Sequence, residues 1–355
     1  MIKRITTQKI ALIYQHDCHP VTKTFSSSIT PYSHSIKKLP FHSISGILYA
    51  FYLALKLPKY DVYLTDSAMS NFVPIFKRWF GEKNIIIYRG ADGIFGEKSN
   101  AYLYTKNILK KRLLLYILKN IDGITTESEM AKNDARHWVN CPIEVNVSYV
   151  NDIKLLSKIK PNLNTKKFLF IGDYRPPHDH KGIEILIDTF NLMPREFELF
   201  IIGKNTEHLK NKKKTNDNIH IEGRVKDLGE YFRKCTYYIH TARYETGPIT
   251  ILEAMSAGLI PICSNTCGHK DFVKKIDSQL VLTSQDPIKI VEQVKKISQI
   301  TIQNKNIYSK KAKKIINFEY SKDIQVKKFK DAFFKLLREI SNEKKRNNGR
   351  RSNEK

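Results

Sequence analysis

The stretch Tyr237–Asn265, YYIHTARYETGPITILEAMSAGLIPICSN, decides the fold of this chain. Its pattern predicts a strand, a loop, a helix and a second strand, in that order. Thr246 and Gly247 suit the N-cap of the helix, and Pro248 suits its first turn, where a missing N–H costs nothing. Gly258 suits the C-terminal end, because glycine readily adopts the left-handed conformation that stops a helix.

The same alternation extends in both directions along the chain. The predicted strands begin at Lys9, Asp61, Asn84, Gly123 and Glu144 in the first half, and at Lys167, Phe197, Asn218, Tyr237 and Leu259 in the second. Apolar strands separated by helices favour parallel, doubly wound sheets, whose ligands bind at the carboxyl ends of the strands. We therefore expect two Rossmann-like α/β domains.

The length of 355 residues suits two domains better than one compact core. A polar segment at Asn151–Lys166 marks the expected boundary. We expect an N-terminal domain over 1–160, a C-terminal domain over 161–320, a helix over 321–341 that packs back toward the N-terminal domain, and a disordered basic tail over 342–355.

The charge of the chain is strongly positive. Lysine and arginine total 61, and aspartate and glutamate total 35, which gives a net charge of +26. Such an excess attracts polyanions, such as nucleic acid, an anionic membrane or phosphorylated substrates. A compositional bias toward lysine would also produce this positive charge, so the charge alone does not identify a partner. The sequence has no zinc-finger spacing and no aromatic–glycine RNA signature, so we expect no nucleic-acid partner.

The five cysteines form no C-x-x-C pair, and their number is odd. A disulfide framework or a structural zinc site is therefore not expected, and a reducing, cytoplasmic compartment is the simpler interpretation. His178 and His180 share a loop without a partner motif, so we expect no metal. The N-terminus does not resemble a signal peptide, and the apolar run from Gly46 is too short to span a bilayer, so any membrane contact should be peripheral.

Two glutamates accompany the helix predicted within Tyr237–Asn265. A helix that starts directly after a strand points its free N–H groups and positive dipole end out of the sheet, which suits a diphosphate. Glu245 lies in the loop before this helix, and Glu253 lies within it. Carboxylates accept hydrogen bonds from the hydroxyls of sugars and riboses. The pattern therefore indicates a site for a molecule that carries both phosphate and sugar.

This pattern resembles a known family. Glu245-x7-Glu253, followed by Ala-Met-Ser-Ala-Gly and Ile-Pro, resembles the signature E-G-F-G-x-x-x-x-E-A-M-A-x-G-x-P of the retaining GT-B glycosyltransferases often called family 4. Lys181 and Gly182 match the K-G of the family's upstream strand, loop and helix. The stretch from Ile221 is similar to another family segment. The likeness is strong across roughly 168–272 and weak before that.

The resemblance implies a GT-B fold, with two domains facing a cleft, and sugar transfer from a nucleotide-sugar donor with retention and without metal. Glu245 would contact the donor sugar near the reacting carbon, Glu253 would hold the ribose, and Lys181 would contact the phosphates. The donor-binding candidates are Gly172, Gly223, Thr246, Gly247, Pro248, Ile249 and Glu253. We expect no cofactor apart from the donor, which we expect to be a UDP- or GDP-sugar.

The chain departs from the family pattern at several positions. Asp173 replaces the usual arginine, so Arg175 becomes a catalytic candidate. Arg89, after a first-half strand, stands where many members have histidine, and we include it among the catalytic candidates. The acceptor-side candidates are His16, Asp17, His19 and Gly90.

The acceptor predicted by the resemblance is a glycan or a lipid-linked glycan, in the biosynthesis of bacterial lipopolysaccharide, capsule or another surface polysaccharide. A catalytically inactive nucleotide-binding module is the alternative, followed by a polyanion-binding protein. The pattern of the basic stretch Lys106–Asn120 predicts a core helix with a solvated basic face. Docking on the anionic inner face of the cytoplasmic membrane is the other interpretation.

Overall fold

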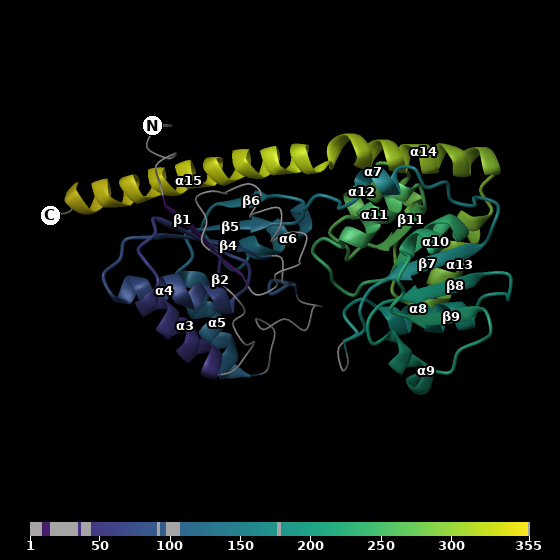
Figure 1. The fold of residues 1–355 in the computed structure, drawn as a ribbon, viewed down its shortest axis with the longest axis horizontal. Coiled ribbons are helices and arrows are strands. Elements are labelled where there is room, and N and C mark those ends of the chain that lie inside the picture. Colours follow the sequence, from purple (N-terminus) through teal and green to yellow (C-terminus); the bar gives the residue numbers. More distant parts are fainter. Residues whose placement is uncertain are drawn as a thin grey trace. The chain divides into compact units, whose positions relative to one another are not determined.

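The chain divides into two units, shown in Figure 1 in a computed structural model that describes residues 9–14, 35–36, 44–90, 93–96, 107–175 and 179–353. Unit 1 is the part up to Tyr149 together with the part from Lys322, and unit 2 is Val150–Ser321. The division falls about ten residues before the expected one at 160, because the helix α7 (Ile153–Leu156) packs against a helix of unit 2.

Unit 1 is built on a sheet of six parallel strands in the order β2-β1-β3-β4-β5-β6. The strands are β1 (Ile10–Ile13), β2 (Ser35–Ile36), β3 (Val62–Thr65), β4 (Ile85–Arg89), β5 (Gly123–Thr126) and β6 (Ile143–Val145), and the connecting helices are α3 (Ile44–Lys56), η1 (Met69–Asn71), α4 (Phe72–Trp79), α5 (Ile108–Lys119) and α6 (Glu129–Arg136). Because side chains alternate along a strand, each strand serves two cores. Ala11 and Ile13 face α3, α4 and α5, whereas Ile10 and Leu12 face the last helix.

The last helix, α15 (Lys322–Asn353), belongs to unit 1. It buries a stripe with helical spacing against the sheet, formed by Phe329, Phe333, Leu336, Leu337 and Ile340. We expected a helix over 321–341 and a disordered tail over 342–355, but α15 continues to Asn353. The helix is already nucleated by its packed turns, so each added residue gains a backbone hydrogen bond, and the segment 342–353 has no proline to stop it.

Unit 2 contains a second sheet of six parallel strands, in the order β12-β11-β10-β7-β8-β9. The strands are β7 (Lys167–Ile171), β8 (Glu198–Ile202), β9 (Ile219–Gly223), β10 (Tyr237–His240), β11 (Ile260–Ser264) and β12 (Val281–Leu282). Besides α7, its helices are α8 (Ile183–Asn191), η4 (Thr206–His208), α9 (Leu209–Lys212), α10 (Leu228–Lys234), α11 (Ile249–Ala257), α12 (Lys270–Lys274), η5 (Ser278–Leu280), α13 (Pro287–Ser298) and α14 (Ile302–Glu319). The predicted doubly wound α/β class is confirmed in both units.

The order of strands reverses between β7 and β10. The chain runs outward from β7 through β8 to β9 on one side, and then returns to place β10 on the other side of β7. In open parallel sheets, the loops that follow the strands diverge at such a point and leave a ligand crevice. The loops after β7 and β10 therefore mark the place in unit 2 where a ligand is expected.

Gly182 lets these two loops come together. Its φ is +69°, and a Cβ there would lie 1.9 Å from the carbonyl oxygen of Thr241. The Thr241 hydroxyl also donates to the Gly182 carbonyl oxygen at 2.8 Å. Only glycine combines this backbone conformation with so close an approach.

We expect Gly182→Ala to lower the free energy of unfolding by about 3 kcal/mol, because it adds both backbone strain and a clash with main-chain atoms. Gly81→Ala is the matched control, since Gly81 has a φ of +85° but nothing within 4 Å of a Cβ. That control should lose only about 1 kcal/mol. Thermal denaturation measures both variants, and equal losses would contradict the role given to the Thr241 contact.

Candidate active site

The helix α11 begins at the carboxyl edge of the sheet of unit 2. Pro248 is its N-cap, with extended backbone at ψ 107°, and Ile249 is its first residue. This corrects the expectation that Thr246 or Gly247 caps the helix and Pro248 lies in its first turn. The Pro248 carbonyl oxygen already accepts from the Ile251 N–H at 3.1 Å, which makes it the first residue in the helical hydrogen-bond pattern. The predicted end is confirmed, because Gly258 is left-handed at φ +94°.

The backbone N–H groups of Ile249 and Thr250 have no hydrogen-bond acceptor within the described part of the chain. The first N–H groups of any helix lack partners inside the helix, and the helix dipole adds partial positive charge there. Both groups lie at the edge of the sheet where the loops after β7 and β10 diverge. They form a potential binding site for an anion such as a phosphate.

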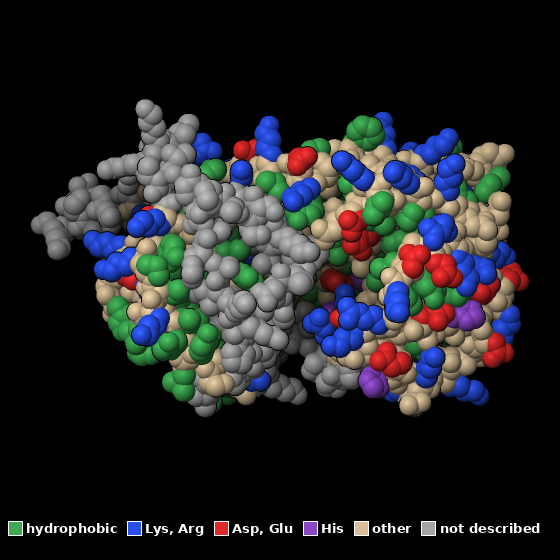
Figure 2. Space-filling view, viewed as in Figure 1, with side chains coloured by type: hydrophobic (Ala, Val, Ile, Leu, Met, Phe, Trp, Pro, Cys, Tyr) green, Lys and Arg blue, Asp and Glu red, His purple; other side chains and the backbone are tan. Residues whose placement is uncertain are grey.

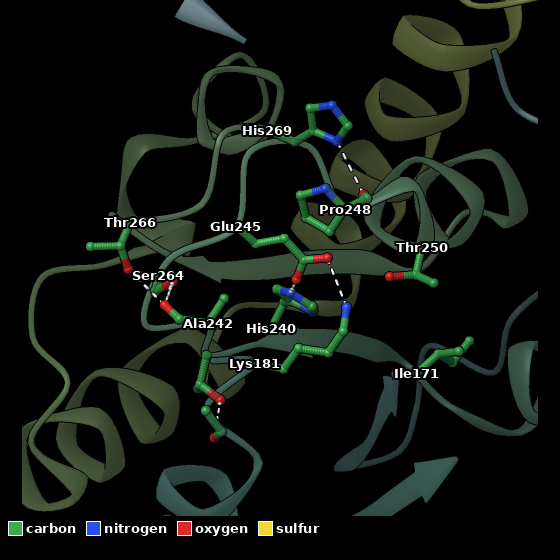
Figure 3. Close-up of polar contacts among 12 residues, drawn as sticks. Ile171, Lys181, His240, Ala242, Glu245, Pro248, Thr250, Ser264, Thr266 and His269 are labelled. Carbon is green, nitrogen blue, oxygen red and sulfur yellow. Dashed lines mark hydrogen bonds and ion pairs between the residues drawn. The ribbon is translucent and has the colours of Figure 1, made fainter. Parts of the chain in front are cut away.

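Glu245 lies between two cationic or hydrogen-bonding side chains. Its Oε1 is 2.7 Å from Nζ of Lys181, and its Oε2 is 2.6 Å from Nε2 of His240. Figure 3 shows both contacts. Lys181 comes from the loop after β7, His240 ends β10, and Glu245 comes from the loop after β10. Burial alone would raise the pKa of Glu245, but the charges of Lys181 and His240 outweigh it and hold that pKa well below its ordinary value.

His240 is fully buried and extends this network toward α11. Its ring stacks on Phe170 with 5.4 Å between the ring centroids. Its Nδ1 lies 3.3 Å from the hydroxyl of Tyr238, which donates to the Thr250 Oγ1 at 2.6 Å. The network thus joins the Glu245 carboxylate to the first turn of α11, so the loop and the helix hold one another in place.

His240 and Tyr238 are absent from the residues predicted from sequence. A signal for them existed, because positions two apart on a strand share one face. Two polar aromatic residues at such positions, at the end of a strand that leads into the Glu245 loop, could have been recognised as part of the site.

Glu253 lies one turn into α11 and differs sharply from Glu245. It is half-buried, and its carboxylate has no hydrogen-bond partner within the described residues. Burial, assisted by the negative charge of Asp152, raises its pKa to about 7. Glu253 therefore presents a carboxyl group whose acceptors are free for a ligand that supplies hydroxyl donors.

The raised pKa of Glu253 predicts how stability depends on pH. The folded state holds this proton more tightly than the unfolded state, so ionisation costs stability as the pH rises from the ordinary value of 4.5 through about 7. Glu253→Gln removes that cost, and at pH 8 it should be about 2 kcal/mol more stable than the wild type, a value reduced for partial exposure. At pH 5 most of the difference should vanish.

Thermal denaturation at the two pH values checks this prediction. Glu292→Gln is the control, because Glu292 is exposed on α13 of the same unit. A gain in stability for Glu253→Gln that is equal at pH 5 and pH 8 would rule out ionisation as its cause.

Gly172 clears the path of the Lys181 side chain. A Cβ on Gly172 would lie 2.8 Å from Cδ of Lys181. Gly223 ends β9 at φ +70° and accepts a hydrogen bond from the Gly203 N–H at 2.8 Å, beyond β7 and β8 from the Glu245 loop. Gly172 thus belongs to the Lys181–Glu245 cluster, whereas Gly223 lies further along the same sheet edge.

Arg175 is not brought into the cluster. Its side chain is 70% exposed, and its guanidinium lies 4.0 Å from the Asp173 carboxylate. Asp173 in turn accepts from the Lys204 N–H at 3.1 Å and so fixes the loop after β8. Arg175 therefore takes no part in the pairing of Glu245 with Lys181 and His240.

Arg89 and Gly90 lie in unit 1, at the carboxyl end of β4. The Arg89 guanidinium forms a buried pair with Glu127 at 2.6 Å, and Glu127 also accepts from the Ser148 N–H at 2.9 Å. A Cβ on Gly90 would lie 2.7 Å from the ring of Phe95. Arg89 therefore ties the loops after β4, β5 and β6 together, and Glu127 is a partner that the sequence analysis missed.

The acceptor-side candidates His16, Asp17 and His19 lie outside the described residues, as does His178 of the loop considered for metal. Within the ranges that the structure covers, no three or more His, Cys, Asp or Glu side chains are grouped to hold a metal ion.

Two Rossmann-like units are typical of the GT-B fold class, and in one of them the N-terminus of a helix lies near a Lys–Glu pair where the order of strands reverses. Residues 152–315, somewhat less than half of the chain, match the family Glycosyl transferases group 1, so this part of the chain is similar to the domain of that group. An uncharacterised glycosyltransferase of Haemophilus influenzae is 25% identical over 173 residues, which are 46% of this chain and 47% of that protein. The chain thus matches about half the length of this curated relative.

Solved structures confirm the GT-B fold over nearly the whole chain. Sucrose-phosphate synthase from Thermosynechococcus elongatus aligns with a TM-score of 0.73 and 15% identity, over 93% of this chain and 99% of its own. HepE from Anabaena, in complex with UDP and glucose, aligns with a TM-score of 0.68 and 13% identity, over 92% of this chain and 99% of its own. WaaG, a glycosyltransferase involved in lipopolysaccharide biosynthesis, aligns with a TM-score of 0.67 and 13% identity, over 91% of this chain and 99% of its own.

Proposed function

We propose that this protein transfers a sugar from a nucleotide-sugar donor to a glycan or lipid-linked acceptor. The observation that carries the proposal is the convergence of three features at one sheet edge of unit 2. They are the free N–H groups of α11, the Lys181–Glu245 pair and the unpartnered carboxyl group of Glu253. The HepE structures with UDP and UDP-glucose support a nucleotide sugar as the ligand.

Each feature corresponds to one part of such a donor. The diphosphate binds at the N-terminus of α11, where N–H groups and the helix dipole favour negative charge. The side chain of Lys181 is 16% exposed, and its ammonium group, which is paired with Glu245 in this structure, would contact a phosphate oxygen of the donor. Glu253 accepts hydrogen bonds from the ribose hydroxyls. UDP is the nucleotide that we favour for the donor, with GDP as the other candidate.

The chemistry follows from these positions. Breaking the bond between the sugar and the diphosphate leaves negative charge on the leaving group and positive charge at the anomeric carbon. Lys181 and the α11 N–H groups stabilise the first, and this preorganised stabilisation takes the place of a metal ion. Glu245, ionised because of its neighbours, stabilises the second. We propose retention of the anomeric configuration, on the family resemblance of the Glu245-x7-Glu253 motif.

The cellular role that we propose is assembly of a bacterial surface polysaccharide, such as lipopolysaccharide or capsule, at the cytoplasmic face of the membrane. The likeness to WaaG supports this role at the level of the fold.

The donor candidates Thr246, Gly247, Pro248 and Ile249 supply the backbone around the diphosphate in this proposal.

A panel of UDP-, GDP-, ADP- and dTDP-sugars tests the proposal. The purified protein should release the nucleoside diphosphate slowly from one donor in the absence of acceptor, and Lys181→Ala should abolish the release. Nucleotide binding without release, and without transfer to any glycan extract, would favour a catalytically inactive nucleotide-binding module instead. If the protein neither binds nor hydrolyses any of these nucleotide sugars, the proposed donor site is overturned.

A further inference from the structure

Exposed apolar side chains concentrate on three helices of unit 1. The helices are α3, α4 and α5, and Phe80 directly follows α4. Their exposed large apolar residues are Leu48, Tyr49, Phe51, Tyr52, Leu55, Trp79, Phe80, Ile108, Leu109, Leu113, Leu115 and Tyr116. Leu109 is 77% exposed, Leu48 64% and Trp79 62%. We call this set the apolar patch. Single exposed apolar residues are ordinary on a protein surface, but a group of this size marks an interaction site.

Contacts between these side chains make the patch continuous across the three helices. Phe51 of α3 packs edge-on against Phe80, which directly follows α4, with 5.6 Å between the ring centroids. The indole N–H of Trp79 in α4 donates to the hydroxyl of Tyr116 in α5 at 3.0 Å. Figure 2 shows hydrophobic side chains gathered over the area where Figure 1 places α3 and α4.

The charged residues within the three helices are all basic. The three helices contain no aspartate and no glutamate. Exposed basic residues lie on these helices or within four residues of their ends, and we call them the basic border: Lys56, Lys59, Lys83, Lys110, Arg112 and Lys119. None of these six forms an ion pair within the described residues. Because the basic stretch 106–120 buries only Leu114, Ile117 and Leu118 of its helix, a core role accounts for only part of its apolar residues.

We propose that the apolar patch and its basic border dock on the surface of an anionic lipid bilayer. Apolar and aromatic side chains enter the boundary between headgroups and acyl chains, where Trp and Tyr are favoured, while lysine and arginine contact the anionic headgroups. A protein partner would need an acidic surface of matching shape, whereas a bilayer satisfies charges of one sign and exposed apolar groups together. No helix within the described residues is long and apolar enough to cross the membrane, so the contact is peripheral.

This inference rests on unit 1 alone and does not depend on the proposed transfer reaction. The test is cosedimentation of the full chain with vesicles of phosphatidylcholine and with vesicles that also contain phosphatidylglycerol. We expect binding to the anionic vesicles only, weakened by high salt because screening reduces the electrostatic part.

Two sets of variants separate the apolar and the charged contributions. Combining Leu48→Ser, Leu55→Ser and Leu109→Ser should weaken partitioning onto anionic vesicles by about tenfold or more. Combining Lys110→Gln, Lys111→Gln and Arg112→Gln should weaken it by about tenfold to a hundredfold. Matched controls on unit 2 are the exposed Leu155, Leu192 and Ile288 changed to Ser, and the exposed Lys210, Lys214 and Lys289 changed to Gln.

The controls should bind vesicles like the wild type, and the patch variants should keep the wild-type melting temperature and any nucleotide binding. Equal binding to neutral and anionic vesicles, or an equal loss in patch and control variants, would overturn the inference. So would a dimer in sedimentation equilibrium that the apolar variant makes monomeric, with no vesicle binding by the wild type. Glu253→Ala, which tests the donor site, should leave vesicle binding unchanged.

Discussion

Lys181→Ala is expected to lower kcat/KM for the nucleotide sugar by about 100- to 1,000-fold, the usual effect of removing one group that stabilises a developing negative charge. The Lys181 ammonium group would be lost from the edge that holds the α11 N-terminus. The variant also takes a positive charge away from Glu245, so the pKa of that carboxyl should rise toward its ordinary range.

The measurement is steady-state kinetics with the donor identified by the panel of nucleotide sugars. Lys181→Arg should recover part of the loss, because it keeps the charge but not the position of Nζ. Lys166→Ala is the matched control, since Lys166 belongs to the same unit and forms an exposed pair with Glu196. An unchanged kcat/KM for Lys181→Ala would contradict a role for Lys181 in the reaction, whether through the leaving group or through Glu245.

The second large effect that we expect is on the pH dependence of donor affinity. If the ionised Glu253 accepts the ribose hydroxyls, its raised pKa of about 7 means that binding must first remove a proton at low pH. The affinity for the intact nucleotide sugar should therefore increase by about tenfold between pH 6 and pH 8. The diphosphate diester of a nucleotide sugar does not titrate in this range, so the change would report on the protein.

Isothermal titration at several pH values measures this effect. Glu253→Gln should bind with an affinity that does not change over the same range, and wild-type binding should release protons in a buffer of suitable ionisation enthalpy. Equal wild-type affinity at pH 6 and pH 8 would show that Glu253 is not the ribose acceptor.

The strand, loop and helix of Tyr237–Asn265 could be predicted because their signals are local. Strand hydrophobicity and the glycine at 258 each act within a few residues. The N-cap was misplaced by one or two positions because Thr246, Gly247 and Pro248 are all acceptable by type. Only the backbone conformation of Pro248 decides between them.

Partners that are distant in sequence were harder to predict. Arg89 was a catalytic candidate by its place after a strand, yet its charge is taken by Glu127, which the neighbouring strand β5 brings beside it. The link between Glu245 and His240 depends on how the loop after β10 folds back on the strand. Such contacts follow from tertiary packing, which no short pattern encodes. The apolar patch likewise became visible only when α3, α4 and α5 were packed together.

A thermal-shift titration with UDP, GDP and ADP, run on the wild type and on Glu253→Ala and Lys181→Ala, tests the central claim most directly. We expect a rise in melting temperature with one nucleotide that is lost or strongly reduced in both variants, because one donor site at α11 contains both side chains. No rise with any nucleotide, or a rise that both variants retain in full, would contradict the donor site.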